Sequence, residues 1–297
     1  MVDEKDTPDR AEPFVRCYDI LDGRFVPSDE GSPGPFDRGF LYGDGLFETI
    51  LVSSGRPVLL AGHIDRMASS ADFLNIPALP DSSVITAEID GVLRSVAETD
   101  AVLKLILSRK GGGRYDCIDH KCFFVIQVLP HTHPPREVYE SGVSLLTSRA
   151  RRSAESPIYR HKTLNYLENI LARREAQSAG AYEALIVNTD DFIAECSMSN
   201  IFFIDGEKLL TPSLECNVLP GITRTCVLSL AADAGIPVSE QSLAFVDILQ
   251  ASEVFITNSL VGIVPVREID GKAFGKTCPG PVTRAITSLY QHQIFKP

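Results

Sequence analysis

The pattern of apolar and polar residues in the first part of the chain predicts a small sheet with two helices. Runs with a strand-like pattern occur at residues 14–21, 23–26, 46–52, 57–60, 101–108 and 122–128. Turn residues between the first four runs, Asp22-Gly23 and Ser54-Gly55, predict two hairpins. Apolar residues recur at helical spacing in 61–75, and 82–98 is the second predicted helix. This order predicts a first domain of strands and helices over residues 14–130.

The remaining pattern predicts a larger domain over residues 142–297, built mainly from strands. Its strand-like runs are residues 143–148, 183–188, 192–196, 201–204, 208–211, 254–257 and 262–266, and its helices are residues 163–179, 222–234 and the stretch after Val282. One face of its first helix is apolar, and we expect this face to point inward. That face consists of Leu164, Leu167, Ile170 and Leu171. The Pro-containing segment 131–141 is predicted to be an interdomain linker, and residues 1–13 a flexible N-terminus.

Composition and charge exclude several classes of function. The 297 residues carry a formal net charge of −11, which argues against a nucleic-acid surface because phosphate binding needs clustered Lys and Arg. The seven Cys residues include no CxxC pair, so neither a disulfide framework nor a metal site is expected. No apolar run reaches the roughly 18 residues that span a membrane, and the charged N-terminus lacks the apolar segment of a signal peptide. We therefore expect a cytoplasmic protein with no membrane partner.

Two residues suggest chemistry that depends on charge. Lys162 follows Arg160 and His161, and cationic neighbours would lower the pKa of its amine and favour Schiff-base formation. The alternative is an ordinary exposed lysine. Glu195, in FIAECSMSNIFFI, is an acid flanked by small and apolar residues. Its carboxylate is either a paired core group or a ligand, for example for the protonated ring nitrogen of pyridoxal phosphate.

Two further segments could bind an anion. In LPGITR (219–224) a Pro-Gly turn opens a predicted helix, so the N–H groups of Ile222 and Thr223 could bind a phosphate. In HIDR (63–66) Arg66 is predicted in the first turn of a helix and could bind a phosphate with its forked donors. The alternatives are a plain helix start and a surface arginine.

Taken in order, the segments around these four features resemble the fold type IV family of pyridoxal-phosphate (PLP) enzymes. That family includes branched-chain and D-amino-acid aminotransferases and 4-amino-4-deoxychorismate lyase. The similar segments are DRGFLYGDGLFETI (37–50), HIDR (63–66), KTLNYLENILARREA (162–176), EALIVNTDDFIAECSMSNIFF (183–203), TPSLECNVLPGITR (211–224) and EVFITNSLVGIVPV (253–266). The resemblance implies an α+β fold with a smaller two-layer α/β domain and a larger pseudo-barrel domain. It also implies a homodimer that binds pyridoxal 5'-phosphate and acts on a small-molecule amino substrate.

The resemblance also implies roles for individual residues. Lys162 falls at the family's Schiff-base lysine, whose freed amine acts as a general base, and Glu195 falls at the carboxylate that holds the pyridine nitrogen. The implied phosphate contacts are Arg66, the amides of Ile222 and Thr223, and Ser259 with the backbone of Asn258. Tyr166 resembles the family's tyrosine near the phenolic oxygen of the cofactor. It is one residue nearer to the lysine here than in branched-chain aminotransferases.

Departures from the family patterns guide the choice of substrate. Arg114-Tyr-Asp116 stands where D-amino-acid aminotransferases carry Arg-x-His, which argues against a D-amino acid. Branched-chain enzymes usually show FEG and GTAA where this chain has Phe47-Glu-Thr49 and Thr257-Asn-Ser-Leu260. These differences, with KTLNYL, are more similar to the aminodeoxychorismate lyases.

The candidate substrate contacts are Phe47, Arg109 and Arg114, whose two guanidiniums could meet carboxylates; the alternative for the arginines is loop solvation. The leading hypothesis is a 4-amino-4-deoxychorismate lyase, which eliminates pyruvate and leaves p-aminobenzoate, a folate precursor. The first alternative is an aminotransferase that acts on branched-chain or other small amino acids with a 2-keto acid acceptor. A third possibility is a catalytically silent PLP-binding or interaction protein, against which the intact Lys162 and Glu195 argue.

Overall fold

The computed structural model describes residues 14–19, 24–27, 34–76, 79–96, 99–111 and 121–295. The chain divides into two compact units, Met1–Thr132 and His133–Pro297, and each is taken by itself. The division falls inside the segment for which the sequence predicts a linker, and a short helix, α5 (Arg136–Glu140), follows it. Within the described ranges, no helix combines the length and the hydropathy that a membrane crossing requires.

The first unit is built around a six-stranded antiparallel sheet with the order β2-β1-β6-β5-β3-β4. Its strands are β1 (Phe14–Asp19), β2 (Arg24–Pro27), β3 (Gly45–Ser53), β4 (Arg56–Pro57), β5 (Ala101–Arg109) and β6 (Cys122–Pro130). Its helices are α2 (Arg38–Tyr42), α3 (Leu60–Phe73) and α4 (Ser82–Ser95). Both hairpin pairings predicted from the sequence are present, β1 with β2 and β3 with β4. The strand predicted over 57–60 is shorter because Leu60 already begins α3.

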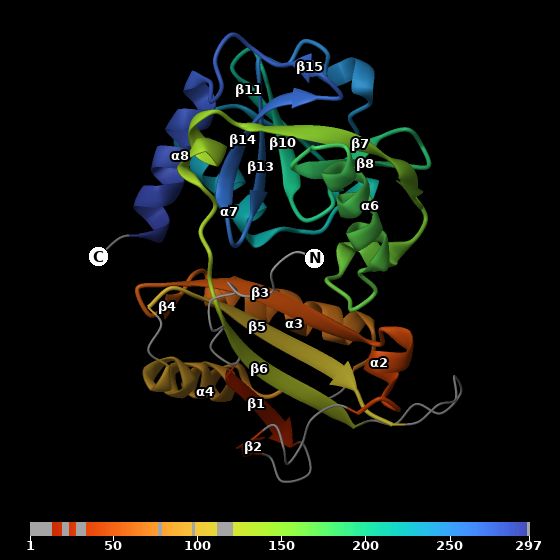
Figure 1. The fold of residues 1–297 in the computed structure, drawn as a ribbon, viewed down its shortest axis with the longest axis vertical. Coiled ribbons are helices and arrows are strands. Elements are labelled where there is room, and N and C mark those ends of the chain that lie inside the picture. The colour runs from red at the N-terminus through yellow and green to blue at the C-terminus, as the bar shows by residue number, and fades with distance from the viewer. Residues whose placement is uncertain are drawn as a thin grey trace, which may run out of the picture. The chain divides into compact units, whose positions relative to one another are not determined.

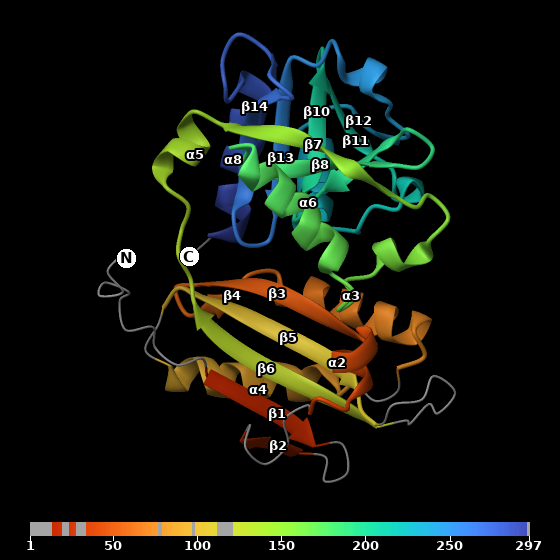
Figure 2. The ribbon, with the colours of Figure 1, turned by 45° about the vertical axis from the view of Figure 1, so that its right-hand side comes forward.

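Helices α3 and α4 cover one face of this sheet (Figures 1 and 2). Strand alternation sends Leu46 and Ile50 of β3 into the core, where they pack with Ile64 of α3 and other apolar residues of the two helices. The intervening residues Phe47 and Thr49 point to the opposite face and are only half-buried. The first unit therefore has one closed face and one more open face.

The second unit contains a nine-stranded mixed sheet in which β12-β11-β10-β13-β14-β7-β8-β9 is the order of neighbours, with β15 paired to β14. Its strands are β7 (Val143–Arg152), β8 (Glu183–Asn188), β9 (Ile193–Cys196), β10 (Asn200–Asp205), β11 (Lys208–Pro212), β12 (Val238–Gln241), β13 (Glu253–Asn258), β14 (Gly262–Ile269) and β15 (Lys272–Ala273). Strand β9 at one end of this order also lies against β10 and β11 near the other end. The sheet therefore curls on itself, which gives the α+β class with a pseudo-barrel that the sequence predicts.

Three longer helices cover the second sheet. Helix α6 (Leu167–Ser178) packs on β7 and β8, whereas α7 (Ile222–Asp233) and α8 (Pro281–Ile294) pack on each other and on β13. Figure 1 shows α6 and α8 on different sides of this unit. The short 3-10 helices are η1 (Pro157–Arg160), η2 (Leu214–Cys216) and η3 (Phe245–Ile248).

The inward face predicted for the helix over 163–179 is wrong. The exposed fractions of Leu167, Ile170 and Leu171 are 66%, 42% and 54%. Ala172 and Ala176 instead face the sheet, where they pack against Ala184 and Ile186 of β8. Small side chains at these positions let the helix approach the sheet closely, and apolar spacing alone does not reveal which face is used.

Candidate active site

Glu195 lies in β9 with a buried carboxylate that has three hydrogen-bond donors. Its Oε1 accepts a hydrogen bond from Nη1 of Arg152 at 2.5 Å. Its Oε2 accepts from Nδ2 of Asn200 at 3.0 Å and from the backbone N–H of Leu219 at 3.1 Å. The structure therefore shows a paired carboxylate, one of the two arrangements that the sequence leaves open.

Arg152, which pairs with Glu195, is itself held by neighbouring groups. Its side chain is 1% exposed, and its Nη1 also donates to the carbonyl of Asn217 at 3.2 Å. Its Cζ lies 4.6 Å from the centroid of the Tyr159 ring. The hydroxyl of Tyr159 in turn donates to Oε2 of Glu168 at 2.6 Å. This chain of contacts fixes the guanidinium that faces Glu195.

The sequence pattern does not single out Arg152. The predicted strand ends at Ser148, whereas β7 continues to Arg152 with a shift of register between Thr147 and Arg151. A bulge of this kind changes which residues face inward, so period-2 alternation cannot tell the buried arginine from its exposed neighbours.

The charge state of Glu195 follows from opposing effects. Burial raises the pKa of this carboxyl above its usual range, and the positive charges of Arg152 and Lys162 oppose that increase. All three hydrogen-bond partners donate to the carboxylate, which favours the ionised form because a protonated carboxyl needs an acceptor. We therefore take Glu195 as an anion paired with Arg152.

Lys162 lies in a non-helical segment between η1 and α6. The N–H of Thr163 donates to the carbonyl of His161 at 3.0 Å, and the N–H of Tyr166 donates to that of Leu164 at 2.9 Å. Helix α6 therefore begins later than the sequence predicts. The Nζ of Lys162 lies 5.3 Å from the centroid of the Tyr166 ring. The structure thus brings Lys162, Tyr166 and Glu195 into one region of the second unit.

The cationic neighbourhood predicted for Lys162 is only partly present. Burial and the positive charge of Arg160 lower the pKa of His161, so this imidazole is neutral near pH 7. Nε of Arg160 donates to Oδ1 of Asn217 at 3.3 Å. Of the two residues before Lys162, Arg160 alone supplies positive charge.

Tyr166 is a neutral phenol at the end of the Lys162 segment. Burial raises its pKa, and the negative charges of Glu195 and Glu183 add to the increase. Its hydroxyl donates to the carbonyl of Ser197 at 3.4 Å, and Nδ2 of Asn169 donates to the same carbonyl at 2.7 Å. The phenol can therefore donate a hydrogen bond at any physiological pH.

The loop that contains Ser197 is held by Glu183, a buried acid that sequence reasoning missed. Glu183 accepts hydrogen bonds from the N–H of Met198 and, at 2.9 Å, from Oγ of Ser199. Oγ of Ser199 accepts from Nδ2 of Asn258 at 3.0 Å, and Oδ1 of Asn258 accepts from the N–H of Leu260 at 2.9 Å. Ser259 lies in the turn that Asn258 shapes in this way.

The predicted anion site lies at the N-terminus of α7. Gly221 is its N-cap residue, no side chain caps the helix, and Ile222 and Thr223 are its first two residues. Nδ2 of Asn200 donates to both Glu195 and the carbonyl of Leu219, at 3.0 Å in each case. One amide thus ties the carboxylate to the turn that opens the helix.

Replacing Gly221 by Ala should disturb this connection. A Cβ at Gly221 would lie 1.9 Å from Oδ1 of Asn200. Asn200 must then move and its bonds to Glu195 and Leu219 weaken, so we expect a loss of about 1–3 kcal/mol in the free energy of unfolding. Urea unfolding checks this, with Gly91→Ala as the comparison, because a Cβ at Gly91 would meet nothing within 4 Å and Gly91, like Gly221, does not have a positive φ. An unchanged stability of Gly221→Ala would contradict it.

In the first unit Arg66 is buried, so the surface alternative is wrong. Its side chain is 8% exposed and lies in the second turn of α3. Nε of Arg66 donates to Oε1 of Glu48 at 2.8 Å, and Nη2 donates to Oε2 at 2.5 Å. Nδ1 of His63 also bonds to Oε2 of Glu48, at 2.7 Å. Sequence reasoning missed Glu48 and His63, although both lie in the quoted motifs.

The three candidate substrate contacts have different surroundings. Phe47 is half-buried on the more open face of the first sheet. Arg109 is 3% exposed, so it is not solvated: Nε donates to Oδ2 of Asp44 at 3.1 Å, and Nη2 donates to backbone carbonyls after α3. Arg114 lies outside the described residues.

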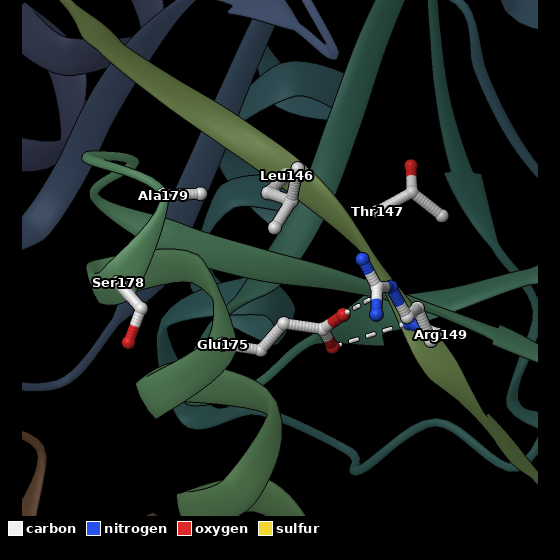
Figure 3. Close-up of a pocket in the computed structure, with 6 residues that line it drawn as sticks. All are labelled: Leu146, Thr147, Arg149, Glu175, Ser178 and Ala179. Atoms are coloured by element: carbon white, nitrogen blue, oxygen red, sulfur yellow. Dashed lines mark hydrogen bonds and ion pairs between the residues drawn. The ribbon is translucent and has the colours of Figure 1, made fainter.

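A cavity of about 360 Å³ in the second unit lies apart from these residues (Figure 3). Leu146, Thr147 and Arg149 of β7 line it together with the end of α6. In Figure 3 the carboxylate of Glu175 faces Arg149, whose Nε lies 3.3 Å from Oε1. Arg149 is largely exposed, and none of the predicted site residues lines this cavity.

Comparison with known proteins places these features in a family. Residues 45–269 match the family model "Amino-transferase class IV". A Methanocaldococcus jannaschii protein whose name is that of a branched-chain-amino-acid aminotransferase is 34% identical over 283 residues, covering 91% of this chain and 94% of that protein. The aminodeoxychorismate lyase of Bacillus subtilis (strain 168) is 30% identical over 282 residues, covering 92% of this chain and 94% of the lyase.

Solved structures show the same fold. The PLP-bound form of a hypothetical aminotransferase from Mycobacterium tuberculosis superposes with a TM-score of 0.78 at 25% identity, covering 95% of this chain and 99% of that chain. The predicted fold type IV resemblance is therefore confirmed, and so is the prediction of an enzyme. This chain belongs to the class IV aminotransferase family, whose similar members are transaminases and lyases.

Proposed function

We propose that this chain is a pyridoxal 5'-phosphate enzyme in which Lys162 holds the cofactor. The residues of the second unit fit such a group. A buried anion, Glu195, is suited to a protonated ring nitrogen, and the uncapped N-terminus of α7 is suited to a phosphate. Gly221 leaves room for Asn200, whose amide ties the turn before this helix to Glu195.

Each residue has a chemical task in this proposal. When bound, the cofactor supplies an aldehyde for an amine and a ring that accepts electrons. Lys162 would hold the cofactor at that aldehyde, and the same amine would take a proton from the substrate carbon. Glu195, kept ionised by Arg152, would hold the proton on the ring nitrogen, and the hydroxyl of Tyr166 would exchange its long bond to the Ser197 carbonyl for one to the phenolic oxygen.

The phosphate contacts are proposed from both sequence and structure. The N–H groups of Ile222 and Thr223 lie at the start of α7, and Ser259 lies in the turn after Asn258. Arg66 is the proposed cationic contact, and its Nε and Nη2 are bonded to Glu48.

We propose 4-amino-4-deoxychorismate as the substrate. The observation that supports it is the half-buried row of Phe47, Thr49 and Lys104 on the more open face of the first sheet, where Thr49 and Lys104 are opposite each other in β3 and β5. An aromatic ring, a hydroxyl and an ammonium suit a ring substrate with carboxylates better than an aliphatic side chain. The same proposal includes contacts of these carboxylates with Nη1 of Arg109 and with Arg114.

The elimination requires little of the protein beyond proton transfer. Lys162 removes the proton from the carbon that bears the amino group, and the neighbouring carbon–oxygen bond breaks. The electron pair leaves with the enol of pyruvate, which takes up a proton, and the remaining ring becomes aromatic p-aminobenzoate.

The test is release of p-aminobenzoate from enzymatically generated aminodeoxychorismate, measured with the wild-type chain and with Lys162→Ala. Release that depends on Lys162 supports the lyase. A PLP-loaded protein that releases no p-aminobenzoate overturns it, and a panel of amino acids and 2-keto acids then tests the alternative. The identity of 34% to the branched-chain relative favours that alternative, a transaminase for branched-chain or other small amino acids.

Lys104 provides a specific test of substrate choice. Replacing Lys104 by Met should raise the KM for aminodeoxychorismate roughly 10- to 150-fold, because one charge-assisted contact is worth about 1.5–3 kcal/mol. The value of kcat should change much less, since Lys104 is not a proton-transfer group in this proposal. Steady-state kinetics on the wild type and the variant measure the two constants, and an unaltered KM argues against a substrate carboxylate at this face.

We also propose that the protein works as a cytoplasmic homodimer in folate synthesis. Support comes from its similarity to the fold type IV family and to the aminodeoxychorismate lyase of Bacillus subtilis. Sedimentation of the purified chain tests the dimer. The pathway is tested by deleting the gene and measuring growth of the strain without p-aminobenzoate.

A further inference from the structure

A buried acid of the first unit joins two residues of one helix. Glu48 of β3 points into the core between its neighbours Leu46 and Ile50, and its side chain is 1% exposed. His63 and Arg66 are three residues apart on α3, so both side chains can reach one carboxylate. The His63 side chain is also 1% exposed.

The contacts fix the plane of the Arg66 guanidinium. Both donors on one edge of Arg66 bond to the two oxygens of Glu48, and His63 bonds to Oε2. A two-pronged pair of this kind restricts the orientation of the guanidinium far more than a single contact. The pair with Glu48 already restricts the Arg66 side chain, so binding an anion costs less side-chain entropy than it would for an isolated arginine.

The ionisation of Glu48 agrees with this geometry. Burial alone would raise its pKa, but the charge of Arg66 and the hydrogen bonds from His63 and Arg66 lower it to about 2. Glu48 therefore stays an anion at any working pH. Burying charges in an apolar core is a poor way to gain stability, because apolar residues of similar volume commonly do as well or better. The arrangement thus indicates that something other than stability is gained.

We propose that Glu48 and His63 are positioning residues that hold the Arg66 guanidinium in the orientation in which it binds the phosphate of the cofactor. This inference rests on the proposed function, because it assigns two further residues to the phosphate contact of the same site. Neither residue touches the reacting atoms, so both act through Arg66.

The experiment compares two ligands that differ only by the phosphate. Pyridoxamine 5'-phosphate and pyridoxamine form no bond to Lys162, so their dissociation constants from the cofactor-free full chain report non-covalent binding. We expect the wild-type chain to prefer the phosphorylated ligand. Glu48→Gln should reduce that preference at least about tenfold while the affinity for pyridoxamine changes less than about twofold. In an Arg66→Met background, Glu48→Gln should change the preference no further.

Variants of His63 and a stability control separate positioning from folding. His63→Asn keeps an N–H donor near the place of Nδ1 and should retain the preference, whereas His63→Leu should lose part of it. Asp81→Ala removes the N-cap of α4 and destabilises the same unit without touching Arg66, so it should leave the preference unchanged. Equal weakening of both ligands by Glu48→Gln overturns the inference. A wild-type chain that binds neither ligand overturns the proposed cofactor site itself.

Discussion

Replacing Arg152 by Met is expected to lower the free energy of unfolding by about 3–5 kcal/mol. The change removes the guanidinium that lies 2.5 Å from Oε1 of Glu195 and leaves a buried carboxylate without its counter-charge. Met fills a similar volume, so a cavity contributes little to the expected effect. Urea unfolding followed by circular dichroism measures the loss.

The neighbouring arginine is a matched control. Arg151 pairs with Asp191 at 2.6 Å, but its side chain is 47% exposed and that of Asp191 is 81% exposed. Exposed pairs contribute about 0–1 kcal/mol, so Arg151→Met should change stability little. The double variant Arg152→Met with Glu195→Gln should be more stable than Arg152→Met alone, because no uncompensated charge remains buried. Equal effects of the two single arginine variants would falsify the assignment.

The loss of stability in Arg152→Met should depend on pH. Burial raises the pKa of Glu195 in the folded state, and loss of Arg152 removes a charge that opposes this increase. A carboxyl with a raised pKa favours folding below its unfolded pKa, and this contribution is lost as the pH rises toward the folded pKa. The destabilisation by Arg152→Met should therefore be larger near pH 8 than near pH 5. A loss of the same size at both values contradicts the proposed charge balance.

Lys162→Ala is expected to reduce kcat by about 10²–10⁴-fold or more. The amine has two proposed tasks, attachment of the cofactor and transfer of the substrate proton, and alanine performs neither. Single-turnover measurement of product formation, with either the lyase or the transaminase substrates, determines the loss. Borohydride treatment followed by mass spectrometry should find cofactor on the peptide that contains Lys162 in the wild type and none in the variant.

An exposed lysine of the same unit controls for the general effect of the substitution. Lys208 begins β11 and is exposed, so Lys208→Ala should retain both the activity and the labelled peptide. Lys162→Ala should also retain non-covalent affinity for pyridoxamine 5'-phosphate, because the phosphate contacts are unaltered. Labelling at another lysine would show that Lys162 is not the attachment point.

The order of strands and helices along the chain follows from the sequence because local periodicity decides it. The stretches around α3, α7, β5 and β13 show clear helical or strand-like apolar spacing, and the structure has these elements close to the predicted bounds. Lys162 and Glu195 can also be identified as candidate site residues from the sequence, since both lie in segments whose joint order resembles one family. Their roles remain predictions, whereas the family is confirmed.

The sequence does not reveal the register of the strands or the partners of the buried charged side chains. A bulge in β7 turns Arg152 inward, and Asn200 reaches both Glu195 and Leu219 because a tight turn brings β10 back beside β9. Glu48 meets Arg66 only because β3 packs under α3. None of these contacts leaves a periodic signal, since each depends on side chains distant in sequence or on a local irregularity.

The sequence by itself determined the class of the fold, the succession of its elements and the family, because these depend on local spacing and on the order of motifs. Only the tertiary structure decided which face of α6 is buried, which arginine pairs with Glu195 and what surrounds Arg66. The physical reason is the same in each case. A buried charge or a close helix contact is stabilised by partners from other elements, and one strand or helix alone does not contain that information.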